Sequence, residues 1–421
     1  MNRNHGPGED SEPKAGHRPA LKRSLSLTQL TLYGLGTTVG AGIYVLVGKV
    51  AGQAGLFTPV AFLVAALLAT LTAFSFAELS SRFPRSAGEA VYVMEGLGSK
   101  SLSLAVGLLV ALAGLVSSAA ITVGAVGYLL EFVTAPPLLL IALMVLLLGG
   151  LAAWGIAESV TVAAVLTLVE IGGLLLVIAS GLEANPDMPA RLDSLLPPLE
   201  LPVWSGILAG ALLAFYAFIG FEDMVNVAEE VKDASRTLPR AILLTMAVTA
   251  LIYLLLTAVA VLAVAPAELA ESDAPLALIY ARTSGGSATV ISLIAIFATV
   301  NGALIQIIMA SRVLYGLSRQ QVLPAALGQV SALTRTPLLA TSLATALMMV
   351  LALLFPIETL ARATSAVTLV IFCLVNLALL RVQHSQPAPA DTTTVPRAIP
   401  LAGLVISAAF LVLECLRLAT G

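Results

Sequence analysis

Long apolar runs, separated by short polar and charged segments, make up most of the chain from residue 27 onwards. About eleven of these runs approach the ~20 residues that an α-helix needs to cross the hydrocarbon core of a bilayer. The predicted spans are 27–50, 56–79, 102–132, 137–156, 160–182, 203–227, 241–264, 288–314, 338–355, 360–380 and 399–418. Because a spanning segment in lipid must satisfy its own backbone hydrogen bonds, the pattern predicts an all-α polytopic membrane protein.

The polar segments fix the expected orientation. Residues 1–26 form a polar tail with five basic residues, expected to be disordered, and the apolar run that follows is too long for a cleaved signal peptide. With the N-terminus inside, the tail and the loop at 384–397 are cytoplasmic, and 398–421 holds the last span. Basic residues then favour the cytoplasmic side by about three to one, which predicts a multi-pass protein of the cell membrane with a cytoplasmic N-terminus.

Composition excludes several other classes of protein. The chain is 59% hydrophobic and 11% charged, whereas soluble domains carry about 25% charged residues. A net charge of -3 leaves no basic surface for nucleic acid. Cys373 and Cys415 both fall inside apolar runs, which indicates buried small side chains rather than a disulfide framework or a metal site. No cofactor is expected, and no enzyme motif is present.

Two spans contain glycine where a helix could be interrupted. The first carries Gly40 and Gly42 near its middle, and the sixth carries Gly220, followed at once by Glu222 and Asp223. The two spans are five apart, and a unit of five crossings must enter the membrane with opposite topology when it is repeated. Matched broken helices in two inverted halves, here 27–182 and 203–383, predict a transporter's binding site. The alternative is that glycine only allows neighbouring helices to approach each other.

Four ordered motifs resemble the amino acid–polyamine–organocation superfamily, with most similarity to its cationic-amino-acid-transporter-like branch. The first span and the loop after the second read GLGTTVGAGIYV (34–45) and FAELSSRFPRSAGEA (76–90). The sixth span and its tail read FYAFIGFE (215–222), AEEVK (228–232) and LPRAI (238–242), and the eighth span ends in SRVLYGLSR (311–319). The resemblance implies a leucine-transporter-like fold of two inverted five-helix repeats, with helices 1 and 6 unwound. Family members usually have twelve or more spans, so eleven is a departure.

The resemblance also implies where a substrate would bind. A broken helix exposes N–H groups that suit a carboxylate and carbonyl groups that suit a cation. The carboxylate of an amino acid is expected at the backbone of Thr38, Val39, Gly40, Ala41 and Gly42. Its ammonium group is expected at the carbonyls of Tyr216, Ala217 and Ile219, with Phe218 over the substrate as a gate.

Two carboxyl groups are candidates for coupling. Glu170 lies near the centre of the fifth span, where this branch often carries a lysine. A carboxyl group at that depth is a functional hypothesis by default, as a proton carrier or as part of a cation site, although a purely structural role is the alternative. Glu222 follows the second break, where it either stabilises the unwound segment or takes part in coupling.

The sequence therefore predicts a secondary transporter, a permease that moves amino acids by alternating access with proton coupling. The alternatives are an amino acid/amine exchanger and a non-transporting membrane sensor. The expected partners are the amino acid, a proton or sodium ion, the lipid bilayer and, as a possible assembly, a second copy of the chain in a homodimer.

Overall fold

The computed structural model describes residues 25–85, 88–154, 160–319, 323–331, 334 and 336–420. Most of the predicted tail, Ser86 and Ala87 of the loop motif, and the predicted end of the fourth span at Ile156 lie outside these residues, as does the side chain of Ala41. Leu25 and Ser26, expected in the tail, belong to the folded part. Leu25 is buried and pairs with Val231, and the Ser26 side chain caps the first helix.

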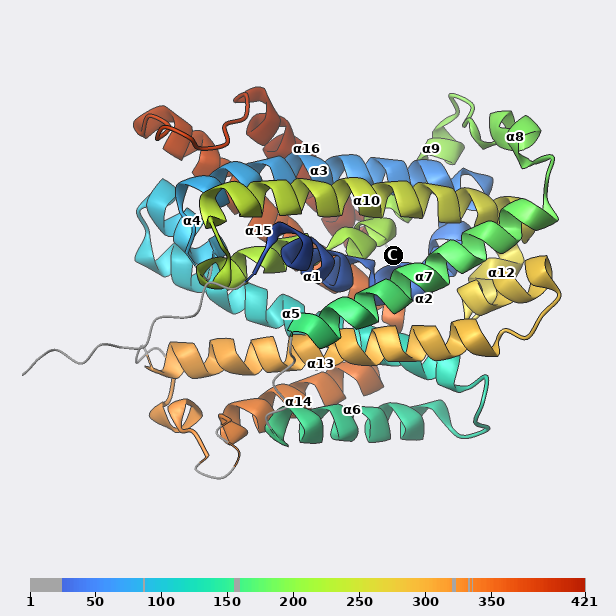
Figure 1. Ribbon diagram of the computed structural model, residues 1–421, viewed down its shortest axis with the longest axis horizontal. Coiled ribbons are helices and arrows are strands. Elements are labelled where there is room, and N and C mark those ends of the chain that lie inside the picture. The colour runs from blue at the N-terminus through green and yellow to red at the C-terminus, as the bar shows by residue number, and fades with distance from the viewer. Residues whose placement is uncertain are drawn as a thin grey trace, which may run out of the picture.

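Helices make up most of the described part of the chain. Those of the first half are α1 (Leu27–Val39), α2 (Ala41–Ala54), α3 (Thr58–Arg82), α4 (Gly88–Leu97), α5 (Lys100–Leu129), α6 (Pro137–Trp154) and α7 (Val160–Ala184). Those of the second half are α9 (Leu201–Phe215), α10 (Ala234–Ala263), α13 (Thr289–Arg319), α14 (Leu338–Leu354), α15 (Ile357–Ser385) and α16 (Ala398–Thr420). Figure 1 shows most of them running lengthwise through the molecule, with α1 and α2 enclosed between the neighbouring helices.

Among the described residues, nine helical stretches are long and apolar enough to cross a membrane. The first, Leu27–Arg82, has 56 residues. At 1.5 Å per residue it would be about 84 Å long, so it must cross twice. With that division and with α14, an apolar helix of 17 residues, the described part has a helix or helix pair for each of the eleven predicted spans.

Short helices between the spans were not predicted. α4 follows the loop motif after α3, whereas α11 (Pro266–Glu271) and α12 (Pro275–Ser284) lie between α10 and α13. α4 packs against α5 and α15, and its buried face includes Tyr92 and Val93. The apolar part of α4 is too short to stand out as a membrane span, so hydropathy alone leaves it inside a loop.

A buried carboxylate joins the end of α3 to the segment that precedes α16. Glu78 has a fully buried side chain and pairs with Arg82 at 2.6 Å. Its Oε2 accepts hydrogen bonds from Gln383 Nε2 and from the backbone N–H of Val395, each at 2.8 Å. The backbone N–H of Thr393 donates to Ser81 Oγ at 3.0 Å. The linker before α16 is thus attached to α3 by charge-assisted hydrogen bonds.

Replacing Glu78 by glutamine should destabilise the protein strongly. The change leaves the Arg82 guanidinium buried without its counter-charge, at a cost of roughly 3–5 kcal/mol. Thermal unfolding in detergent should show a lower transition temperature, and limited proteolysis should cut faster between residues 386 and 397. The matched control is Glu268→Gln, which breaks an exposed pair with Arg282 and should cost about 0–1 kcal/mol. Equal effects of the two substitutions would contradict the anchoring role of Glu78.

Candidate functional site

The first span is interrupted at a single residue. Gly40 ends α1 and begins α2 with φ -53° and ψ -133°, and no side chain caps the start of α2. The first N–H groups of a helix have no partner within it and carry the positive end of its dipole. A Cβ atom added to Gly40 would meet only the carbonyl oxygen of Gly36, at 3.5 Å, so the main chain is not tightly packed at this point.

The second interruption is longer and depends on glycine. α9 passes into a short 3₁₀ turn, η3 (Tyr216–Phe218), before the extended residue Ile219 and a second 3₁₀ segment, η4 (Phe221–Glu230). Gly220 has φ +125°, a conformation that side-chain-bearing residues rarely adopt. A Cβ atom there would lie 2.4 Å from the carbonyl oxygen of Thr37. Only glycine therefore allows the two interruptions to come this close.

Hydrogen bonds join the two interruptions. The hydroxyl of Thr37 donates to the carbonyl of Gly220 at 2.9 Å. The hydroxyl of Tyr253, on α10, lies 2.9 Å from the carbonyl oxygen of Thr38 and 3.0 Å from that of Ala217. Peptide groups freed in the interior need such partners, because a buried polar group left unpaired is costly. Tyr253 thus serves both broken helices at once.

The nine predicted substrate residues, 38–42 and 216–219, are brought together at this crossing, and their side chains occupy different surroundings. Thr38 is buried, and its hydroxyl has no hydrogen-bond partner among the described residues. Gly42 packs against Ala217, since a Cβ atom added to it would lie 2.5 Å from the Ala217 Cα. Gly42 therefore allows the main chains of the two interrupted segments to touch, rather than only admitting a ligand.

The aromatic residues of η3 hold the interruption in place. The Tyr216 hydroxyl lies 2.9 Å from Ser117 Oγ and so connects η3 to α5. Phe218 is 1% exposed and packs on Phe62 and Tyr253, with ring centroids 6.3 and 5.1 Å apart. Ile219 faces a cavity that Phe218 does not line. The gate role of Phe218 stays a prediction, and in this conformation its ring belongs to the core.

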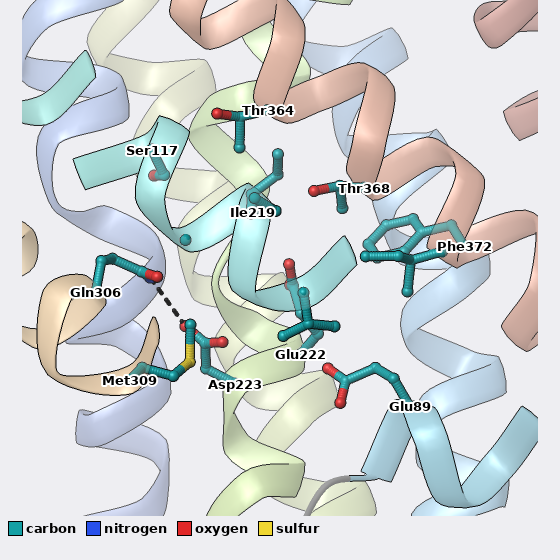
Figure 2. A pocket seen from close by; sticks show the side chains of 14 residues that line it. Glu89, Ser117, Ile219, Glu222, Asp223, Gln306, Met309, Thr364, Thr368 and Phe372 are labelled. Atoms are coloured by element: carbon teal, nitrogen blue, oxygen red, sulfur yellow. Dashed lines mark hydrogen bonds between the residues drawn. The ribbon is translucent and has the colours of Figure 1, made fainter. Parts of the chain in front are cut away.

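A small acidic cavity, with a volume of about 30 Å³, begins at Ile219 (Figure 2). Its walls come from α4, α5, η4, α13 and α15. The lining residues are Glu89, Val110, Ala113, Gly114, Ser117, Ile219, Glu222, Asp223, Gln306, Met309, Thr364, Thr368, Ile371 and Phe372. Three of these side chains are carboxylic acids and none is basic. Such a lining favours a positively charged or proton-donating ligand.

Each acid of the cavity has a different environment. Glu222 Oε2 accepts the backbone N–H of Gly220 at 2.9 Å, which stabilises the interruption, and Asp223 Oδ2 accepts a hydrogen bond from Gln306 Nε2 at 3.3 Å. Glu89 Oε1 is buried without a partner among the described residues. Burial raises the pKa of the Glu89 carboxyl to about 8; a hydrogen bond from its own backbone N–H opposes this shift and the charge of Asp223 adds to it.

Glu170 lies elsewhere, beside the first interruption. Its side chain is 3% exposed, and its backbone carbonyl accepts a hydrogen bond from the Tyr44 hydroxyl at 2.6 Å. One turn earlier, α7 touches α1 closely, because a Cβ atom on Gly36 would lie 2.2 Å from Thr167 Oγ1. The two predicted coupling residues are thus separated, since Glu222 lines the acidic cavity and Glu170 does not. Their coupling roles stay predictions.

Several residues of the cavity were not singled out as a site from the sequence. Glu89 stands within the loop motif, and Asp223 was noted only as the neighbour of Glu222. Gln306 lies within the predicted span 288–314. The sequence signal for Glu89 is its place as an acid directly after Gly88 within the loop motif. Among the described residues, no group of three His, Cys, Asp or Glu side chains is arranged to hold a metal ion.

Comparisons with known proteins identify relatives of this chain. The sequence profile described as amino acid permease matches residues 25–418. The branched-chain amino acid permease BcaP of Bacillus subtilis is 28% identical to this chain, over 95% of this chain and 88% of that protein. Two Arabidopsis thaliana proteins, the mitochondrial cationic amino acid transporter 3 and the vacuolar cationic amino acid transporter 2, are each 29% identical, over 88% and 91% of this chain.

This chain spans 64% of the length of each plant transporter, less than two thirds. The family profile nevertheless covers almost all of this chain, including both interruptions and the acidic cavity. The resemblance seen in the four motifs is confirmed. The chain belongs to the amino acid permease family of the amino acid–polyamine–organocation superfamily, whose members are polytopic membrane transporters with the leucine-transporter-like fold.

Proposed function

We propose that this protein is a secondary active transporter that carries an amino acid by alternating access, with the substrate held between the two helix interruptions. The observation that supports this proposal most is the pairing of an uncapped helix start at Gly40 with the carbonyl-rich turn at 216–219. An amino acid carries a carboxylate and an ammonium group a few ångströms apart. The two interruptions offer complementary partial charges.

Each end of the substrate has candidate partners. The free N–H groups at the start of α2, with the unpartnered hydroxyl of Thr38, suit the carboxylate. At the other end, the carbonyls of Tyr216 and Ala217 already accept one bond each, from the N–H of Ile219 and from Tyr253. A carbonyl oxygen can accept two hydrogen bonds, so both retain a lone pair for the ammonium group, as does the carbonyl of Ile219.

The acidic cavity supports an amino acid with a positively charged side chain as the substrate. The relatives' names cover both branched-chain and cationic amino acids, so membership of the family does not choose between them. The cavity continues from Ile219 toward Glu222 and Asp223. A side chain that extends from the substrate site into this cavity meets carboxylates there, and a cationic group is attracted to them.

Proton coupling remains the leading proposal for the driving force, with Glu170 and Glu222 as the candidate groups and sodium as the other coupling ion. Glu170 lies on the helix that packs against α1, so a change of its charge acts directly next to the first interruption. The second candidate function is exchange of an amino acid for an amine. Flux into preloaded vesicles separates the two, because exchange shows trans-stimulation without a requirement for a proton gradient.

The proposed setting is the cell membrane with a cytoplasmic N-terminus, and a homodimer is the possible assembly. The helix ends support this orientation. Lys49 donates to the carbonyl of Ala270, and Arg191 donates to the carbonyl of Leu262, which supports a position for both at the sparsely basic face. The ends of α3 and α15 bring Arg82 and Arg381 to the other face, as expected for the cytoplasmic side.

Replacing Tyr253 by phenylalanine should reduce uptake of L-arginine or L-leucine into proteoliposomes by roughly tenfold or more. The substitution keeps the ring that packs on Phe62 and Phe218 but removes the hydroxyl that serves both interruptions. The matched control is Tyr92→Phe, which removes a buried hydroxyl with no partner among the described residues and should leave uptake unchanged. Undiminished uptake by the Tyr253 variant would refute the importance of the connection between the two breaks.

Glu170→Gln should abolish the dependence of uptake on a pH gradient while counterflow without a gradient continues. Glutamine keeps the shape of the side chain but cannot bind and release a proton. Uptake driven by an imposed pH gradient provides the measurement. Glu183→Gln, at the exposed end of the same helix, serves as the control. An unchanged proton dependence in the Glu170 variant would show that the coupling proton binds elsewhere.

Asp223→Asn should raise the KM for L-arginine by about tenfold and leave that for L-leucine nearly unchanged, because it removes one of the charges that a cationic side chain would meet. Competition uptake with both amino acids measures the two values. Asp233→Asn, at an exposed position beyond the cavity, is the control, and asparagine tolerates the left-handed backbone found there. Equal changes for both amino acids would argue against a cationic substrate.

A further inference from the structure

Glu89 reaches the cavity from a helix that is not a membrane span. α4 is held closely at both ends. A Cβ atom on Gly88 would lie 2.4 Å from Val225 Cγ2 of η4, and one on Gly96 would lie 2.6 Å from the carbonyl oxygen of Ala378 on α15. Glu89 is 3% exposed, and Figure 2 shows its carboxyl group directed toward Glu222. Its position is thus fixed by packing on both sides.

Among the described residues, the other groups facing Glu89 provide no positive charge. From η4 come Glu222 and Asp223, both acidic. The cavity residues of α5 and α15, the two other helices packed against α4, contain no titratable side chain, and α13 contributes Gln306 and Met309. On α4 itself the nearby titratable group is Tyr92. Three carboxylates in one enclosed space of low dielectric repel each other, so they cannot all be ionised without a cation.

The hydrogen bonds distinguish which acid holds a proton. The N–H of Gly220 stabilises the negative charge of Glu222, and the amide of Gln306 stabilises that of Asp223. Glu89 Oε1 has no such donor among the described residues. A hydrogen bond to the charged form of a carboxyl group favours that form, and its absence favours the protonated form. Among the described residues, no other residue donates a hydrogen bond to Glu89 Oε1, so its carboxyl is the candidate for holding a proton.

We propose that Glu89 is a proton-binding site of the cavity, occupied when no cationic ligand is present and vacated when the positively charged side chain of a substrate enters. This inference rests on the proposed function and adds to it a titrating residue outside the two interruptions. The cationic side chain of the ligand supplies the positive counter-charge that is missing from the cavity. Glu89 then ionises, its O–H bond breaks, and the proton passes to bulk water.

Binding measured against pH tests the exchange of proton for cation. L-Arginine should bind the purified protein more tightly as the pH rises from 6 to 8, by up to about tenfold per pH unit if one proton is released per ligand. Glu89→Gln should remove most of this dependence, whereas L-leucine binding should be nearly independent of pH in both proteins. The control is Glu95→Gln. Glu95 also lies on α4, is partly exposed and pairs with Arg85, so this variant should behave as the wild type.

Thermal stability without ligand gives a second readout that needs no transport. The folded-state pKa of Glu89 is raised to about 8, above the ordinary glutamate value of about 4.3. The stability that its proton contributes is therefore fully present when the pH is below the ordinary pKa, and it is lost as the pH rises toward 8. The transition temperature of the wild type should fall more steeply over this range than that of Glu89→Gln.

The outcomes separate the two proposals. A pH profile of Glu89→Gln that matches the wild type in both measurements would overturn the role of Glu89, even if L-arginine binds and is transported. Failure of the wild type to bind either amino acid would instead count against the proposed function, and the ligand-free stability profile would still decide whether Glu89 holds a proton. A flattened profile with Glu95→Gln would also count against Glu89, because the effect would then belong to α4 in general.

Discussion

A single hydroxyl group, that of Tyr253, lies within hydrogen-bond distance of two main-chain carbonyls in the interior and shares its one proton between them. One belongs to Thr38, just before the first interruption, and the other to Ala217, just before the second. Without such a partner, each broken helix would expose peptide groups to a medium that cannot hydrogen-bond them. The positive φ of Gly220 and the close contact of Gly42 with Ala217 bring the two main chains near enough for one side chain to serve both. The rest of the candidate site depends on this crossing.

The electrostatics on the two sides of the crossing differ in sign. The start of α2 presents uncapped N–H groups and the positive end of a helix dipole. The cavity that begins at Ile219 presents three carboxylic acids. A ligand with a carboxylate at one end and one or two cationic groups toward the other fits this gradient. The same arrangement makes the unliganded cavity unfavourable for full ionisation, which links substrate charge to protonation of Glu89.

Much of the architecture could be predicted because it depends on local patterns. Hydropathy located the spans, and the glycines at 40, 42 and 220 marked both interruptions. The direction of individual side chains could not be predicted, because it depends on contacts between distant segments. Phe218 packs on Phe62 and Tyr253, from α3 and α10. Glu89 enters the cavity only because Gly88 and Gly96 allow α4 to pack tightly on η4 and α15. One sequence does not reveal such long-range packing.

The most direct measurement is an experimental structure of the protein with bound L-arginine. The account predicts ligand density between Gly40 and residues 216–219, with the carboxylate at the start of α2, the α-ammonium group at the carbonyls of η3, and the guanidinium group in the cavity toward Asp223. A ligand bound away from both interruptions would contradict it, as would continuous first and sixth helices that leave no free peptide groups between them.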